Sequence, residues 1–137
     1  MKVFLDANVF VDVLVLRENR QFTIDAAKTI SALKSMPFSI NAAAISIPIL
    51  AYVIKGLSPE DKKLKIKNIL EKVDILPSHK RHVDFALKGS FADIEDAMQY
   101  ACAKEHSCDL IITRDVRDFK GSEIPVMTPS EFLAEIG

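Results

Sequence analysis

The sequence predicts an α/β fold, a three-layer α/β/α sandwich around a mainly parallel sheet of about five strands. One observation predicts the fold class, and a second predicts the number of domains. Short apolar segments rich in Val, Ile and Phe alternate with longer helix-like segments along the whole chain, which is typical of a parallel sheet covered by helices. The chain also has 137 residues, the length of one domain, so we expect a single domain spanning residues 1–137.

Five segments have the length and composition of strands. The first ends at Asp6, the second follows Pro37, and the third is closed by Pro77. The predicted strands cover residues 2–5, 38–43, 73–76, 110–113 and 125–127.

Helical patterns fill the gaps between these strands. The last helix has the clearest start, because Thr128 offers an N-cap, Pro129 suits the first helical position and Glu131 completes a capping box. The other predicted helices cover residues 8–16, 23–35, 46–55, 59–72, 83–88 and 93–105.

The composition excludes several classes of protein. Hydrophobic residues at 49% and charged residues at 27% are ordinary for a globular protein and argue against disorder. No apolar run approaches the roughly 18–20 residues of a membrane span, and Asp6 interrupts the N-terminal run where a secretory signal would continue. Two cysteines, Cys102 and Cys108, are too few for a disulfide scaffold. We therefore expect a cytoplasmic protein with no membrane association.

Carboxylates follow two of the predicted strands. Asp6 follows the first strand, and Asp115 and Asp118 follow the fourth. In parallel sheets the functional site usually lies at the carboxyl ends of the strands. Asp6 and Asp115 are therefore expected at the same edge of the sheet. A single Asp after a strand is more often a turn residue, but several acids brought together repel one another unless a cation neutralises them.

Two further acids, Asp93 and Asp96, open the helix before the fourth strand. Residues three apart share a helical face, so these two are expected to point together while Glu95 points elsewhere. Asp93 also suits an N-cap position. Carboxylate oxygens are ligands that Mg²⁺ takes, together with waters and phosphates, so these acids indicate a site for a divalent cation.

The net charge of −1 argues against a uniformly basic surface but hides an uneven distribution. Residues 53–92 contain nine basic and five acidic residues, whereas residues 93–118 contain three basic and seven acidic ones. The basic stretch is either an ordinary solvated helix face or a surface that binds the phosphates of a nucleic acid beside an acidic metal site.

Four segments that contain or flank these acids resemble the PIN-domain family, of the kind found as VapC-type toxins of toxin–antitoxin pairs. The resemblance rests on the order and spacing of four segments and covers essentially the whole chain. They are VFLDANVF at residues 3–10, DIEDAMQYA at 93–101, IITRDVRDF at 111–119 and IPVMTPSEF at 124–132. The resemblance implies a PIN-like fold and a Mg²⁺- or Mn²⁺-dependent ribonuclease whose metal is held by a cluster of acids.

The resemblance also implies roles for individual residues. The implied metal-binding and catalytic acids are Asp6, Asp96 and Asp115, and Asp118 is a second catalytic candidate in the same turn. Asn8 and Thr113 match small polar positions that support these acids or a bound water.

One departure from the family pattern concerns a glutamate usually found on the helix after the second strand. We place this position at Ile49, and no acid lies anywhere in residues 31–58. Two alternatives are open. Asp93 could substitute as a catalytic and metal-binding acid, in a site made of Asp6, Asp93, Asp96 and Asp115. Otherwise metal binding is weakened, and the chain is a PIN-like module that binds RNA or an antitoxin with little or no catalysis.

The implied reaction is hydrolysis of an RNA phosphodiester bond, in which Mg²⁺ or Mn²⁺ lowers the pKa of a water and screens the phosphate. Arg114 and Arg117 flank the acidic turn and are candidates for binding RNA phosphates, although a surface role fits them equally well. A toxin of this family is also expected to pair with an antitoxin protein and to form a homodimer.

Overall fold

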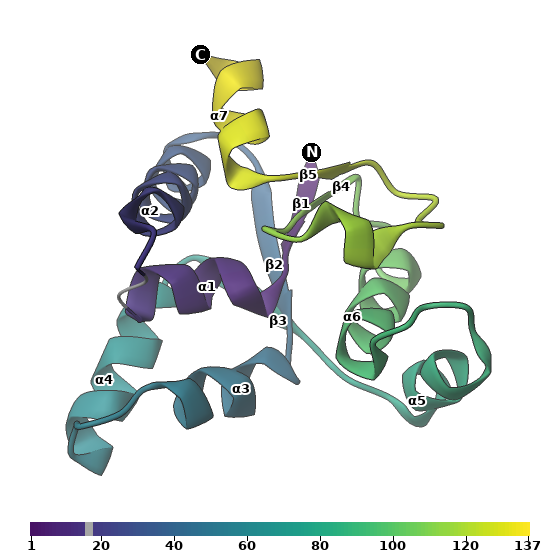
Figure 1. The fold of residues 1–137 in the computed structure, drawn as a ribbon, viewed down its shortest axis with the longest axis horizontal. Coiled ribbons are helices and arrows are strands. Elements are labelled where there is room, and N and C mark those ends of the chain that lie inside the picture. The colour runs from purple at the N-terminus through teal and green to yellow at the C-terminus, as the bar shows by residue number, and fades with distance from the viewer. Residues whose placement is uncertain (16–17) are drawn as a thin grey trace.

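The computed structural model, which describes residues 1–15 and 18–137, contains a five-stranded sheet (Figure 1). The strands are β1 (Lys2–Leu5), β2 (Ser39–Ala43), β3 (Val73–Leu76), β4 (Leu110–Ile112) and β5 (Val126–Met127). Their order in the sheet is β3-β2-β1-β4-β5, and every neighbouring pair is parallel. The prediction of a mainly parallel sheet of about five strands is confirmed.

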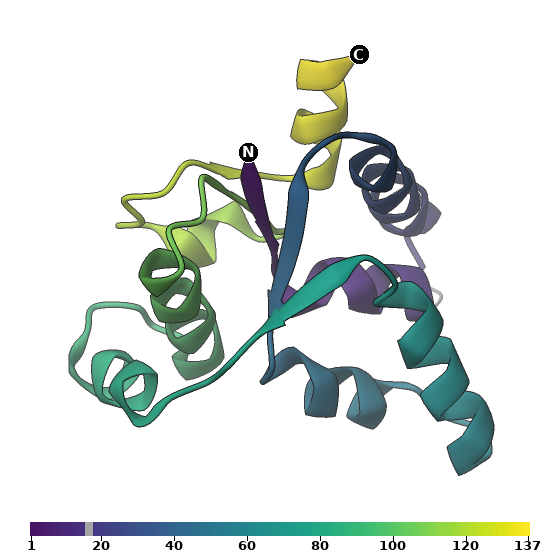
Figure 2. The ribbon, with the colours of Figure 1, turned by 180° about the vertical axis from the view of Figure 1, so that it is seen from behind.

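Helices cover both faces of this sheet. They are α1 (Ala7–Leu14), α2 (Arg20–Ser35), α3 (Ser46–Val53), α4 (Pro59–Ile69), α5 (Lys80–Lys88), α6 (Ile94–Glu105), the 3-10 helix η1 (Val116–Phe119) and α7 (Pro129–Ile136). Helices α1, α2, α3, α4 and α7 lie on one face, and α5, α6 and η1 lie on the other (Figures 1 and 2). The molecule therefore has the three layers that the sequence predicts.

Differences from the predicted elements are confined mainly to element ends. Helix α2 begins at Arg20 because the side chain of Asn19 accepts a hydrogen bond from the backbone N–H of Gln21 and caps the helix. Helix α5 begins at Lys80, three residues before the predicted start, and η1 was not expected. The predicted end of the first helix, Leu16, lies outside the described residues.

The sheet separates two hydrophobic cores. Successive side chains of a strand point to opposite faces, so Val3 and Leu5 of β1 enter one core while Phe4 enters the other. The first core also contains Phe10 of α1, and the second contains Tyr100 of α6. Burying a side chain of this size contributes roughly 1.5–3 kcal/mol. Strand β1 is thus packed on both faces, so the backbone of Asp6, the residue that follows it, is held rigidly.

The pairing of β1 with β4 places two polar residues side by side. Leu5 lies opposite Ile112, and the backbone N–H of Asp6 donates to the carbonyl of Ile112 at 3.0 Å. Asp6 and Thr113, the next residue of each strand, are therefore neighbours at the carboxyl edge of the sheet.

The basic stretch of residues 53–92 is divided between two helices. Its lysines at positions 62, 63, 65 and 67 belong to α4, whereas Lys80, Arg81 and Lys88 belong to α5. These two helices cover opposite faces of the sheet (Figures 1 and 2), so the stretch does not form one continuous rim. Within the described part of the chain, no helix has the length and apolar character needed to cross a membrane.

Candidate metal centre

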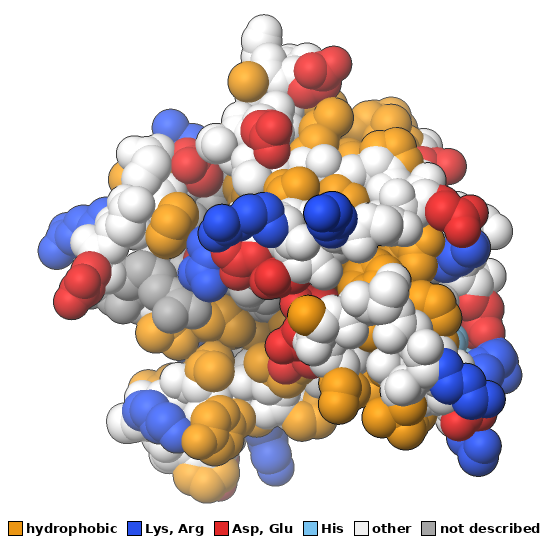
Figure 3. Space-filling model, turned by 45° about the vertical axis from the view of Figure 1, so that its right-hand side comes forward, with side chains coloured by type: hydrophobic (Ala, Val, Ile, Leu, Met, Phe, Trp, Pro, Cys, Tyr) orange, Lys and Arg blue, Asp and Glu red, His pale blue; other side chains and the backbone are white. Residues whose placement is uncertain are grey.

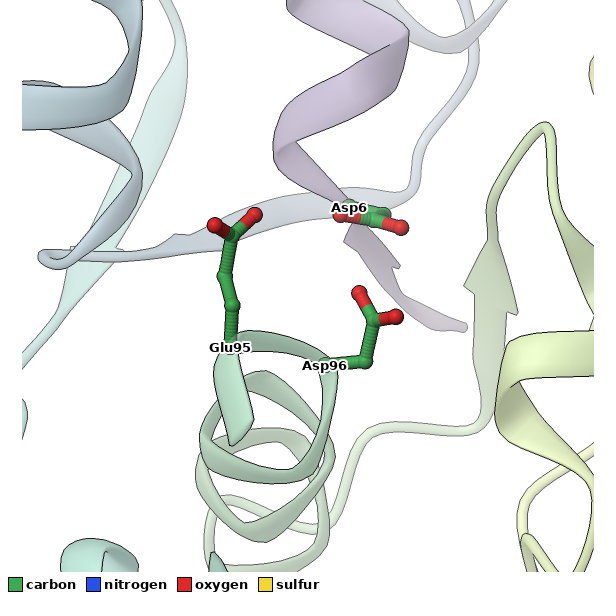
Figure 4. Close-up of side chains that lie close together, drawn as sticks. All are labelled: Asp6, Glu95 and Asp96. Atoms are coloured by element: carbon green, nitrogen blue, oxygen red, sulfur yellow. The ribbon is translucent and has the colours of Figure 1, made fainter. Parts of the chain in front are cut away.

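Three carboxyl groups converge at the carboxyl edge of the sheet. Asp6 comes from the end of β1, and Glu95 and Asp96 come from the first turn of α6 (Figure 4). Each offers an oxygen that lies within 4.8 Å of the other two. Asp6 and Asp96 are buried, while Glu95 is exposed, so the three acids form a partly enclosed site that opens to solvent on one side.

Asp6 is held in place by two side chains from distant parts of the chain. The Thr113 hydroxyl donates to Asp6 Oδ2 at 2.7 Å, and Gln99 Nε2 donates to Asp6 Oδ1 at 2.9 Å. Gln99 Oε1 also accepts a hydrogen bond from the backbone N–H of Ala7 at 3.0 Å. Gln99 is fully buried, so it fixes both the carboxylate of Asp6 and the first turn of α1. The sequence did not single out this residue.

The two predicted supporting residues lie where support for Asp6 is needed. Asn8 Nδ2 donates to the Thr113 hydroxyl at 3.2 Å, and Asn8 Oδ1 accepts from the backbone N–H of Arg114 at 3.2 Å. Asn8 therefore ties the first turn of α1 to the segment after β4 and orients the hydroxyl that binds Asp6.

Gln99→Leu is expected to lower the free energy of unfolding by about 2 kcal/mol or more, because it leaves the buried backbone N–H of Ala7 without its partner and removes one hydrogen bond from Asp6. Urea denaturation with a chelator present would measure this change. The control is Gln21→Leu, because Gln21 is exposed and its side chain bonds to Asp25 at the surface; its effect should stay within about 0.5 kcal/mol. Equal stability of the two variants would show that the Gln99 bonds contribute little.

Burial and mutual repulsion favour the protonated forms of these acids. Burial, followed by the charges of Asp6 and Asp93, raises the pKa of Asp96 to about 8. The same causes raise the pKa of Glu95. Burial also raises the pKa of Asp6, although the hydrogen bonds from Thr113 and Gln99 oppose that shift. Oxygen donors that repel one another in this way fit a hard divalent cation, which would neutralise them.

The affinity for Mn²⁺ is expected to rise with pH up to about pH 8 and then to level off, because a proton on Asp96 competes with the ion. Isothermal titration across this range, in buffers of different ionisation enthalpy, would give both the affinity and the number of protons released. In Asp93→Asn the levelling-off should move to lower pH, since the charge of Asp93 helps to raise the pKa of Asp96. A pH-independent affinity would contradict the assignment of Asp96 as a ligand.

The prediction that Glu95 points away from the other acids is wrong. Its carboxyl group lies with Asp6 and Asp96, and Figure 4 shows the side chain extending from α6 towards the level of Asp6. Asp93 instead caps α6, where its Oδ1 accepts from the backbone N–H of Asp96 at 2.9 Å. Among the described residues, the group of three acids thus includes Glu95 and not Asp93.

The other two predicted acids lie at the rim of the site. The Asp115 side chain is 46% exposed and lies 3.6 Å from Arg114 Nη2, and its charge contributes to the raised pKa of Asp6. Asp118 lies in η1 and is exposed, and its charge contributes to the raised pKa of Asp96. Both acids therefore act on the site electrostatically without joining the group of three.

The two arginines proposed to bind RNA have different surroundings. Arg114 Nη1 forms an ion pair with Asp12 at 2.8 Å, and its guanidinium lies over the ring of Phe22 at 5.2 Å. Arg117 is exposed. Ile49, at the position assigned to the missing family glutamate, is half-buried and packs against the first core.

Comparison with known proteins agrees with this geometry. A family model described as PIN domain matches residues 2–117. This chain belongs to the PIN-domain family. It is also 31% identical over 137 residues to Ribonuclease VapC1 of Aquifex aeolicus, a match that covers 96% of this chain and 92% of that protein. The chain is thus a PIN-domain protein related to VapC ribonuclease toxins.

Solved structures show the same fold. A chain of VapBC-1 from nontypeable Haemophilus influenzae matches with a TM-score of 0.70 and 17% identity, covering 95% of this chain and 99% of that chain. A chain of a toxin-antitoxin complex from Klebsiella pneumoniae matches with a TM-score of 0.67 and 21% identity, covering 93% and 97%. At these identities the similarity establishes a PIN-like fold and nothing finer.

Proposed function

We propose that this protein is a Mg²⁺- or Mn²⁺-dependent endoribonuclease that acts as the toxin of a toxin–antitoxin pair. The observation that carries the proposal is the convergence of Asp6, Glu95 and Asp96 within 4.8 Å at the carboxyl edge of the sheet. The 31% sequence identity to a ribonuclease, which extends over 96% of this chain, supports the same activity.

The residues of this chain divide into those that hold the ion and those that position them. Asp6, Glu95 and Asp96 would bind one or two divalent ions through carboxylate oxygens. When bound, such an ion supplies Lewis acidity and lowers the pKa of a water, which gives a nucleophile near neutral pH. Thr113 and Gln99 keep Asp6 in one orientation. Asp115, whose side chain is 46% exposed, would orient a water that approaches from solvent.

The structural relatives suggest the partners. One similar chain comes from a toxin-antitoxin complex of Klebsiella pneumoniae, and another comes from VapBC-1 of Haemophilus influenzae. We accordingly propose that an antitoxin protein binds this chain and inhibits it. We also propose that the chain forms a homodimer. Co-expression with a small protein encoded beside it, followed by size-exclusion chromatography, would test both.

A second candidate function is RNA or antitoxin binding without catalysis. The observation that favours it is the absence of an acid in residues 31–58, together with the packing of Ile49 against the core. Glu95 supplies a third carboxylate from α6 instead, which is why we favour the enzyme.

Incubation of purified protein with a panel of RNAs and matching DNAs tests the two functions. The enzyme should cleave RNA with Mn²⁺ or Mg²⁺ and should stop when a chelator is added. A protein that binds RNA equally well with and without metal, and cleaves none of the panel, would establish the binding module instead.

A further inference from the structure

A groove of about 530 Å³ lies beside the three acids, between the segment that leads into α6 and the end of η1. One wall is formed by residues 90–93, and the other by Arg117, Asp118, Lys120 and Gly121. Sites for small organic ligands commonly occupy about 300–1,000 Å³. The groove therefore has room for one nucleotide, whereas a base-paired duplex is much wider.

One residue that lines the groove is bonded to a residue of the candidate metal centre. Asp93, which lines it, accepts a hydrogen bond from the backbone N–H of Asp96 at 2.9 Å. Asp118 lies on the opposite wall of the groove. A strand whose phosphate lies at the three acids would therefore have its neighbouring nucleotide at this groove.

The basic side chains of the groove are available for a ligand. Arg117 and Lys120 are exposed, and neither forms an ion pair with any residue that the structure describes. Arg114, by contrast, is paired with Asp12. Figure 3 shows Lys and Arg side chains directly beside acidic ones near the middle of this face. Arg117 and Lys120 would supply the cations that a phosphate beside the candidate metal centre needs.

The walls of the groove are held by packing rather than left loose. The ring of Phe91 stacks on Tyr100 with centroids 4.9 Å apart, and it meets the edge of Phe119 at 6.1 Å. These contacts attach one wall to α6 and to η1. Gly121 has a φ of +95°, a conformation that side chains rarely adopt, so a glycine is needed where the chain turns after Lys120. The site is thus largely preformed.

We infer that this groove seats one unpaired nucleotide of the RNA substrate next to the phosphate that is cut, with Arg117 and Lys120 bound to its flanking phosphates. The inference rests on the ribonuclease function proposed above and adds its substrate-binding site. The strand must be unpaired at this point, because a base in a duplex cannot enter a groove of this size.

Binding of RNA to proteins that cannot cleave it tests the groove. In an Asp6→Asn background, the affinity for a short fluorescent single-stranded RNA would be measured by anisotropy, with a chelator present. Arg117→Ala with Lys120→Ala should weaken binding by about tenfold or more. Losing two phosphate contacts should also reduce the slope of log affinity against log salt by about 1.4.

The matched control is Lys63→Ala with Lys67→Ala, which removes the same charge from exposed positions on α4. It should weaken binding by less than about twofold. Annealing the RNA to its complement should abolish the difference between the groove variant and its parent. The inference is overturned if the groove variant binds as tightly as the parent, if the control weakens binding equally, or if the parent binds no RNA.

Cleavage by the wild-type protein is scored separately. Metal-dependent cleavage without any dependence of RNA binding on Arg117 and Lys120 would refute the groove and leave the ribonuclease intact. RNA binding that depends on these two residues, without cleavage, would support the groove and refute the ribonuclease.

Discussion

Asp6→Ala is expected to reduce metal-dependent RNA cleavage about a thousandfold while the protein stays folded. Asp6 is the most buried of the three acids, at 2% exposure, and one of its oxygens lies within 4.8 Å of an oxygen of Glu95 and of Asp96. Removing it takes away one proposed ligand and the rigid support that β1 gives to the site. Metal-ion catalysis contributes several kcal/mol to a barrier, and about 4 kcal/mol corresponds to a thousandfold in rate. Initial cleavage rates at saturating Mn²⁺ would measure the loss.

Two comparisons make this result specific. Asp74→Asn changes an exposed acid on β3, at the edge of the sheet away from β4, and should cleave at the wild-type rate. Thermal unfolding with a chelator present should show Asp6→Ala folded, because loss of a repelled buried charge offsets the loss of the three hydrogen bonds from Thr113, Gln99 and the backbone N–H of Asn8. Cleavage by Asp6→Ala at the wild-type rate would mean that the activity comes from another site or from a contaminant.

The sheet and its acidic edge were predictable because both depend on local patterns. Strand-length apolar runs such as residues 2–5 are bounded by charged or turn residues, and parallel pairing then brings Asp6 to the edge where β4 ends. Asp6 was identified in this way, whereas Asp96 was identified at the start of a predicted helix and from the resemblance to the PIN-domain family; the structure brings their carboxyl groups together. Helix ends were less predictable, because caps such as Asn19 precede the apolar pattern.

Gln99 and Glu95 were missed for different physical reasons. Gln99 bonds to a residue 93 positions away, and nothing in the neighbouring sequence distinguishes it from an ordinary helical glutamine. Glu95 was excluded by helical spacing, which describes where a side chain starts and not how far it reaches. A glutamate has one more methylene than an aspartate, so its carboxyl group reaches across the helix end to Asp6. Asp93 is not one of the three converging acids, because its side chain caps α6 by accepting from the backbone N–H of Asp96.

Glu95→Gln is expected to weaken Mn²⁺ binding by about 100-fold or more and to slow cleavage correspondingly at limiting metal. Residues that merely support metal ligands commonly change affinity 10- to 100-fold, and loss of a direct carboxylate ligand should cost at least as much. Glutamine keeps the size of the side chain and the helical position, so the change is confined to charge and donor strength. High Mn²⁺ should restore part of the rate, since Asp6 and Asp96 remain.

Asp93→Asn is the matched variant, because it removes the same charge two residues away on the same helix turn. Asparagine caps helices as well as aspartate does, so the bond to the backbone N–H of Asp96 should survive. Mn²⁺ affinity should then change by less than about threefold. The opposite order, with Asp93→Asn losing the metal and Glu95→Gln retaining it, would restore the site of Asp6, Asp93, Asp96 and Asp115. If both variants bind metal normally, neither acid replaces the missing glutamate, and two aspartates are enough for the ion.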